Sequence, residues 1–241
     1  VGGGTGGAPA GIGAARRGAR TLVVEYLHGL GGIGTLGLIG KYYYGYREGF
    51  TKQIDDGVIA LGGERAQKRG GWNVEDKMEW FRRELHKAGA DIWFGVMGVG
   101  AYVVDGQVRG AVIATPQGRG VILTDVVIDS TGSADIAIAA GADYDFTGAE
   151  HAALQGTGLP PRQPDASYTN TDYTFVDDSD PVDVWHSFVV AKEKFAGAYD
   201  LGQIVDTRER RRIVGDFTIS PLDIMNHRTY PDTVNIAYSN F

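Results

Sequence analysis

The glycines at the start of the chain have the type and spacing needed to hold a phosphate group. Gly2, Gly4 and Gly7 fit the pattern G-x-G-x-x-G, and the stretch from Ala8 to Arg17 reads as a helix. In this pattern the first glycine permits a tight turn, the second lets the backbone approach a pyrophosphate, and the third lets the helix pack on a strand. The helix N-terminus adds free N–H groups and a partial positive charge. Motif and context together predict a dinucleotide site.

An acidic residue follows at the distance that a nucleotide ribose requires. The apolar run Thr21–Val24 predicts a strand, and Glu25 ends it. A carboxylate at about 20 residues from the glycines can accept hydrogen bonds from ribose hydroxyls. We interpret Glu25 as this ligand, the alternative being an ordinary solvated carboxylate at a strand end.

Two further segments place glycine where a backbone could meet a ligand. The run from Tyr26 to Thr35 is rich in glycine and poor in charge, which favours a loop lying flat against a planar ligand. The segment 129–135 has the character of a strand-to-helix turn, with Ser133 as the expected cap of a helix over 136–140.

Residues that could act as acids, bases or anion ligands are few. Arg211 belongs to a basic cluster that could hold an anionic substrate by bidentate pairing, although a solvated or ion-paired strand is the simpler interpretation. His227 and Arg228 follow a short helix that begins at Ser220, where a loop could present them to a pocket. His227 is the candidate general acid or base, with a surface histidine as the alternative. We predict no metal site.

The composition narrows the class of protein. The 241 residues carry a formal net charge of -7, which gives no electrostatic footprint for nucleic acid. The absence of cysteine excludes disulfides, thiolate catalysis and cysteinyl iron–sulfur clusters. No apolar stretch approaches the ~18 residues of a membrane span. The compartment stays open, with the cytoplasm as the default and a lost signal peptide not excluded.

Periodicity outlines the elements that must position these residues. Asn73 is the expected N-cap of an amphipathic helix over 73–88. Three strands with short turns between them then predict an antiparallel meander, over 99–104, 108–114 and 121–128. Farther on, the sequence predicts a stiff proline-rich connector, a strand and a helix, over 159–164, 168–176 and 181–196.

These elements predict an α/β protein. We expect a Rossmann-like dinucleotide-binding domain over 1–145, with the meander and the helix 73–88 inserted, and a smaller α+β substrate-side region over 146–241. Because Val1 directly precedes Gly2, nearly all of the first strand is missing, and we expect the chain to be part of a longer protein.

The chain resembles FAD-dependent oxidoreductases of the glutathione-reductase-like superfamily. The resemblance lies in four stretches spread over nearly all of the chain: VGGGTGGAPAGIGAARRGARTLVVE (1–25), LGGIGTLGLIG (30–40), VIDSTGSADIAIAAGA (127–142) and RRRIVGDFTISPLDIMN (210–226). Glycines at positions 11 and 18 extend the first motif to the longer form seen in such flavoproteins. One departure is Ser133, where the family usually has aspartate, and another is the absence of the family's C-terminal segment.

The resemblance also implies roles for individual residues. Gly2, Gly4 and Gly7 would hold the FAD pyrophosphate, and Glu25 the adenosine ribose. The remaining implied cofactor contacts are Gly31, Gly32 and Thr35 along the phosphates toward the flavin, and Thr131 and Gly132 from the meander side.

The sequence thus predicts a flavoenzyme that moves a hydride or two electrons between a small organic substrate and FAD, and that could form an oligomer. Alternatives are an NAD(P)-binding dehydrogenase without flavin and a nucleotide-binding subunit without turnover. A non-redox isomerase or lyase that uses flavin also stays open.

Overall fold

The chain forms two compact units in the computed structural model. One comprises Val1–Ala142 with Gly215–Phe241, and the other comprises Asp143–Val214. The structure describes residues 1–37, 39–42, 47–63, 71–146, 180–194 and 211–232. The proposed domain boundary at residue 145 remains a prediction.

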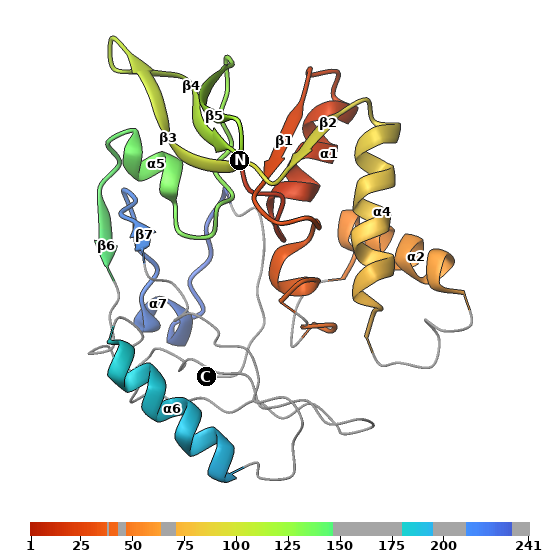
Figure 1. Cartoon of the computed structure of the whole chain (residues 1–241), viewed down its shortest axis with the longest axis vertical. Helices are drawn as coiled ribbons and strands as arrows, with labels where there is room; N and C mark the ends of the chain where they lie inside the picture. The colour runs from red at the N-terminus through yellow and green to blue at the C-terminus, as the bar shows by residue number, and fades with distance from the viewer. Residues whose placement is uncertain (38, 43–46, 64–70, 147–179, 195–210, 233–241) are drawn as a thin grey trace. The chain divides into compact units, whose positions relative to one another are not determined.

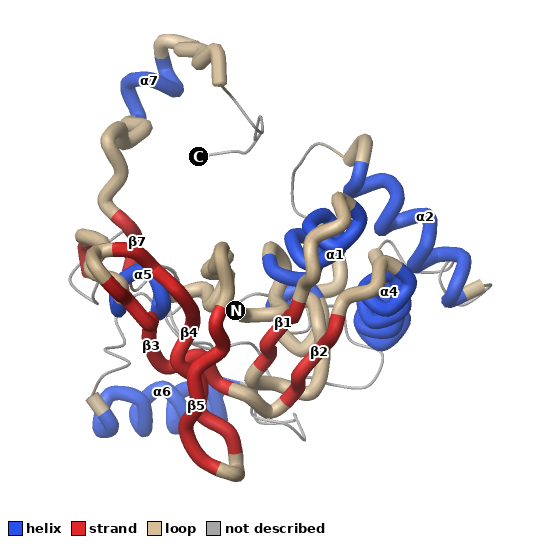
Figure 2. The backbone as a smooth tube through the Cα atoms, turned by 90° about the horizontal axis from the view of Figure 1, so that it is seen from above, coloured by secondary structure: helices blue, strands red, loops and turns tan. Residues whose placement is uncertain are grey.

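A short parallel sheet with helices packed against it forms the N-terminal part of the first unit. Strand β1 (Leu22–Glu25) pairs in parallel with β2 (Asp91–Phe94), and helices α1 (Gly7–Arg16), α2 (Phe50–Gly62) and α4 (Val74–Lys87) lie beside the two strands (Figures 1 and 2). The side chains that these elements bury together are Ala8, Ile12, Ala15, Val23, Leu30, Ile54, Val58, Trp80, Phe81, Leu85 and Ala90. The expected helix–strand pair at the N-terminus is therefore confirmed.

The first residues of the chain extend this parallel arrangement. The Val1 nitrogen donates to Ile128 O at 2.8 Å, and Ser130 N donates back to Val1 O at 2.8 Å, which is the pattern of a parallel bridge. On the other side Gly2 N donates to Val24 O at 2.8 Å. The start of the chain thus lies between β1 and the segment 128–130.

Helix α4 begins where its cap residue predicts. The Asn73 side chain accepts hydrogen bonds from Glu75 N at 2.9 Å and Asp76 N at 3.0 Å, which satisfies two of the free N–H groups of the first turn. The buried face of the helix comprises Lys77, Trp80, Phe81 and Leu85. The inserted helix is thus confirmed, but its buried face includes a lysine that the periodicity did not indicate.

The predicted meander is present as an antiparallel sheet in the order β3 (Met97–Val104), β4 (Gln107–Thr115) and β5 (Gly118–Leu123). Asp105 and Gly106 both have positive φ, 52° and 73°, as the tight turn between β3 and β4 requires. The expected end of the third strand at residue 128 is wrong. The chain leaves the sheet after Leu123, because Ile128 and Ser130 pair with Val1 instead.

The second unit contains a two-stranded antiparallel ladder, in which β6 (Tyr144–Phe146) pairs with β7 (Arg211–Ile213). Its helix α6 (Pro181–Lys194) begins at the predicted residue 181, and Asp180 Oδ1 accepts from Val182 N at 2.8 Å. The predicted connector 159–164 and strand 168–176 lie outside the described residues.

The C-terminal part of the first unit contains helix α7 (Pro221–Met225). Ser220 and Asp223 form a reciprocal capping box around its first turn, as expected for a helix that begins at Ser220. Among the described residues, no helix is both long and apolar enough to span a lipid bilayer.

Candidate functional site

The first and third glycines of the N-terminal motif lie in contact with each other and with the segment that follows the meander. A Cβ atom at Gly7 would meet Gly2 O at 1.7 Å, and one at Gly2 would meet Ser130 O at 2.3 Å. Gly2 also has a φ of 84°, in the left-handed region that favours glycine. The close packing of helix on strand therefore requires glycine at both positions, as the motif predicts.

The second glycine-rich segment lies directly on the first. Gly31 N donates to Gly3 O at 2.8 Å, and Thr5 Oγ1 donates to Gly31 O at 3.0 Å. The segment turns through the 3-10 helix η1 (Gly32–Gly34), and a Cβ atom at Gly32 would lie 3.0 Å from Gly4 Cα. Glycines 28 residues apart in the sequence thus share one backbone surface.

Glu25 holds the glycine loop and the residues beyond β1 in place. Its side chain is buried, with Oε2 accepting from Gly3 N at 2.6 Å and Oε1 accepting from Leu27 N at 2.8 Å. Each carboxylate oxygen has a second lone pair, so these bonds leave room for further donors such as ribose hydroxyls. The carboxylate therefore lies at the junction of the phosphate loop and the end of β1.

The turn into α1 leaves backbone donors available. Within the part of the chain that the structure describes, the N–H groups of Gly4, Thr5 and Gly6 donate no hydrogen bond. A Cβ atom at Gly4 would meet only Gly32 Cα, at 3.9 Å, so this face of the loop is open. Open backbone with several free N–H groups at the start of a ten-residue helix fits a pyrophosphate.

Asp129 organises the turn on the meander side. Its Oδ1 accepts from Thr131 N and Thr131 Oγ1, and its Oδ2 accepts from Ile136 N and Ala137 N, all between 2.8 and 3.0 Å. Burial tends to raise the pKa of Asp129, but the hydrogen bonds from Thr131, Ala137 and Ile136 outweigh it and hold the pKa below its ordinary value.

The expected capping role of Ser133 is wrong. Helix α5 (Asp135–Ala139) has Ala134 at its N-cap position with a φ of 54°, and no side chain of the cap residue bonds the first turn. Asp129 takes that role across the turn, because its carboxylate accepts the two N–H groups that a cap would accept. The change from aspartate to serine at position 133 therefore leaves the helix start intact.

Three of the predicted cofactor residues differ in how accessible their backbone or hydroxyl groups are to a ligand. Gly132 is exposed, has a φ of 88°, and would have nothing within 4 Å of an added Cβ atom. The Thr131 hydroxyl donates to Asp129 Oδ1 at 2.8 Å and accepts a hydrogen bond from Asp135 N at 2.9 Å. Thr35 is fully buried and donates its hydroxyl to Leu30 O at 2.6 Å. The two threonines thus hold their own loops in shape.

Among the described residues, no hydrogen bond or ion pair links His227 or Arg228 to the glycine segments of this surface. Arg228 Nη1 donates to Asp223 Oδ1 at 2.9 Å, and its guanidinium lies 5.1 Å from the centre of the Phe217 ring. His227 is exposed just after α7, with a φ of 52°. Arg211 lies in β7 of the other unit, so the catalytic roles of all three remain predictions.

Residues 1–196 match the protein family described as FAD dependent oxidoreductase, so the chain belongs to this family. FAD is the cofactor that defines it. No curated protein sequence matches the chain.

Solved structures similar to the chain include THI4 from Thermovibrio ammonificans, with 23% identity, 57% of this chain and 58% of that chain covered, and a TM-score of 0.43. A geranylgeranyl bacteriochlorophyll reductase-like protein from Thermoplasma acidophilum has 17% identity, coverages of 86% and 63%, and a TM-score of 0.46. Aklavinone-11 hydroxylase in complex with FAD and aklavinone has 18% identity, coverages of 66% and 37%, and a TM-score of 0.44. The chain thus spans between 37% and 63% of the length of these structures.

Proposed function

We propose that the surface formed by Gly2–Gly7, Gly31–Gly34 and the turn at Thr131–Gly132 binds FAD, and that the whole protein uses it to transfer a hydride or two electrons to or from a small organic substrate. The observation that carries this proposal is the contact among three segments that are far apart in the sequence. Most of these contacts join backbone atoms, and the Thr5 hydroxyl adds one hydrogen bond to Gly31 O. Family membership supports FAD over other dinucleotides.

In this proposal each part of the surface has a distinct task. The free N–H groups of Gly4, Thr5 and Gly6 donate to the pyrophosphate, and the positive end of α1 favours its charge. Glu25 accepts from the ribose hydroxyls while it fixes the loop through Gly3 N. FAD, when bound, supplies the redox chemistry, and the protein supplies orientation and electrostatics.

The alternative without flavin predicts strands and helices that alternate in a parallel sheet beyond residue 90. The described chain instead continues from β2 into the antiparallel sheet β3-β4-β5. This favours the flavoprotein interpretation over a plain NAD(P)-binding domain. Arg211, His227 and Arg228 remain the candidates for substrate binding and proton transfer, and oligomer formation remains a proposal.

A side chain at Gly4 tests the site without disturbing the fold. The variant Gly4→Val fills the open face of the loop, where the protein itself offers only Gly32 Cα at 3.9 Å. We expect this variant to unfold at the temperature of the wild type but to lose FAD affinity by at least about a hundredfold, because the valine occupies the place of the pyrophosphate. Gly13→Ala is the matched control, since an added Cβ atom there meets nothing within 4 Å.

Each variant and the wild type are titrated with FAD and with NAD⁺, and quenching of the flavin or protein fluorescence reports the binding. Retention of full FAD affinity by folded Gly4→Val would refute the proposed site. Tighter binding of NAD⁺ than of FAD by the wild type would instead favour the dehydrogenase alternative.

A further inference from the structure

A lysine lies within the buried face of helix α4. Lys77 is only 5% exposed, and its Nζ lies 3.4 Å from the centre of the Trp72 ring and 5.2 Å from that of Tyr42. A buried ammonium loses its hydration, and aromatic faces return only part of that free energy. The position therefore needs a reason beyond packing.

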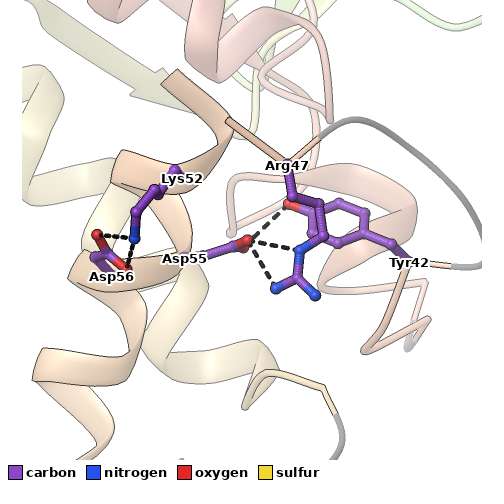
Figure 3. Close-up of polar contacts among 5 residues, drawn as sticks. All are labelled: Tyr42, Arg47, Lys52, Asp55 and Asp56. Atoms are coloured by element: carbon purple, nitrogen blue, oxygen red, sulfur yellow. Dashed lines mark hydrogen bonds and ion pairs between the residues drawn. The ribbon is translucent and has the colours of Figure 1, made fainter. Parts of the chain in front are cut away.

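Asp55 is the carboxylate whose charge acts on Lys77, and it already accepts hydrogen bonds from other residues. Asp55 Oδ2 accepts from Arg47 Nε at 3.0 Å and from Arg47 Nη2 at 2.8 Å, and its Oδ1 accepts from Tyr42 OH at 3.3 Å (Figure 3). Asp55 acts on Lys77 through its charge, and Arg47 opposes it. Among the described residues, no oxygen accepts a hydrogen bond from Lys77 Nζ.

The ammonium lies behind the glycine loop of the proposed FAD site. A Cβ atom at Gly34 would be 3.5 Å from Lys77 Nζ, and Trp72 Nε1 donates to Gly34 O at 2.5 Å. At its other end the same short helix η1 lies on Gly4, which belongs to the loop with free N–H groups. The two glycines of η1, Gly34 on the side of Lys77 and Gly32 on the side of Gly4, thus lie between the ammonium and the loop, and the side chain of Ile33 between them is exposed.

We propose that Lys77 is a positioning residue for the dinucleotide, whose buried ammonium attracts the diphosphate through the glycine loop and holds that loop closed on it. This inference rests on the proposed FAD site. In a region without bulk water the attraction between a cation and a doubly charged diphosphate is screened only weakly. An anionic ligand would add a countercharge to that of Asp55, which Arg47 already engages.

The pH dependence follows from the charge on this group. Burial lowers the pKa of Lys77 from 10.5 to about 8, Asp55 raises it in part, and Arg47 lowers it. A bound diphosphate favours the ammonium and raises the pKa again. Affinity for the diphosphate is therefore fully present below pH 8 and is lost as the pH rises above 8, by at most about tenfold per pH unit.

The test measures the dissociation constants of ADP and adenosine for the full chain at about pH 7.5 and pH 9.5. ADP carries the diphosphate and has no group that titrates in this interval, whereas adenosine lacks the phosphates. The variants are Lys77→Met, which removes the charge but fits among aromatic rings, and Lys77→Arg, which stays charged across the interval. Circular dichroism verifies that each variant is folded.

For the wild type we expect the ADP dissociation constant to rise about tenfold between the two pH values. Lys77→Met should bind ADP about tenfold more weakly at pH 7.5 and show no further change, Lys77→Arg should show little pH dependence, and adenosine should bind alike throughout. The same pH dependence in Lys77→Met, or equal losses for ADP and adenosine, would overturn the inference. Failure of the wild type to bind either ADP or FAD would overturn the proposed site itself.

Discussion

The contact between Gly7 and Gly2 permits a quantitative test of the N-terminal motif. An added Cβ atom at Gly7 would lie 1.7 Å from Gly2 O, whereas real Cβ contacts do not fall below 3.0 Å. Gly7→Ala therefore forces helix α1 and the first glycine apart by about 1.3 Å. The displaced helix carries the fully buried Ala8 and Ile12, so the shift disturbs the core as well as the phosphate loop.

Overpacking of this kind costs about 1–3 kcal/mol of unfolding free energy, which corresponds to roughly 2–12 °C in a domain of this size. The matched control is Gly13→Ala in the same helix, which adds a Cβ atom to open space and should gain about 0.5–1 kcal/mol. Thermal denaturation followed by circular dichroism measures both effects. If Gly7→Ala proved as stable as Gly13→Ala and retained FAD affinity, the argument from close packing would be wrong.

Further predictions concern single side chains. Glu25→Gln should weaken FAD binding by about tenfold or more and cost about 1–3 kcal/mol of stability, because the amide has one oxygen acceptor where the carboxylate accepts at both oxygens. FAD titration and denaturant unfolding measure the two effects. Unchanged values in both would contradict the assigned role. Asp129→Asn should cost about 1–3 kcal/mol of unfolding free energy. The wild type should lose this contribution in acid, as the pH falls below 3.8 through the lowered pKa of Asp129. Measuring the stability of both proteins against pH tests this, and equal acid sensitivity would refute it. Without FAD, the free energy of unfolding should rise as the pH goes from 8 toward 9.5, by at most about 1.4 kcal/mol per pH unit, because the unfolded state binds more protons at Lys77 than the native state. Denaturant unfolding measures this, and Lys77→Met should show no such rise in stability. Asn73→Ala should cost about 0.5–2 kcal/mol without changing FAD affinity, and a large loss of affinity would show that helix α4 is coupled to the site more strongly than its cap suggests.

Signals close together in the sequence were sufficient to predict the elements whose ends are marked by a cap, a turn or a glycine motif. The glycine motif with α1, the Asn73 cap of α4, the Asp105–Gly106 turn and the Ser220 start of α7 all depend on residues close together in the sequence. Short-range sterics and capping hydrogen bonds decide such features. They are therefore readable without the fold.

Features decided by distant partners could not be read in this way. The end of β5 depends on pairing between Ile128 and Val1, and the start of α5 depends on Asp129 reaching across a turn. Helix α2 was not predicted, although Ile54 and Val58 have helical spacing. Lys77 could have been noticed as a charged residue on the apolar face that Phe81 marks, but its neighbours Trp72 and Gly34 are known only from the fold.

The measurement that tests the central claim most directly is a visible absorption spectrum of the intact natural protein, taken before and after denaturation and filtration. We predict the two bands of oxidised flavin, with the chromophore released on unfolding and its mass equal to that of FAD. A band that stays with the polypeptide would indicate a covalent flavin link. A protein without flavin absorbance, even after incubation with added FAD, would contradict the account.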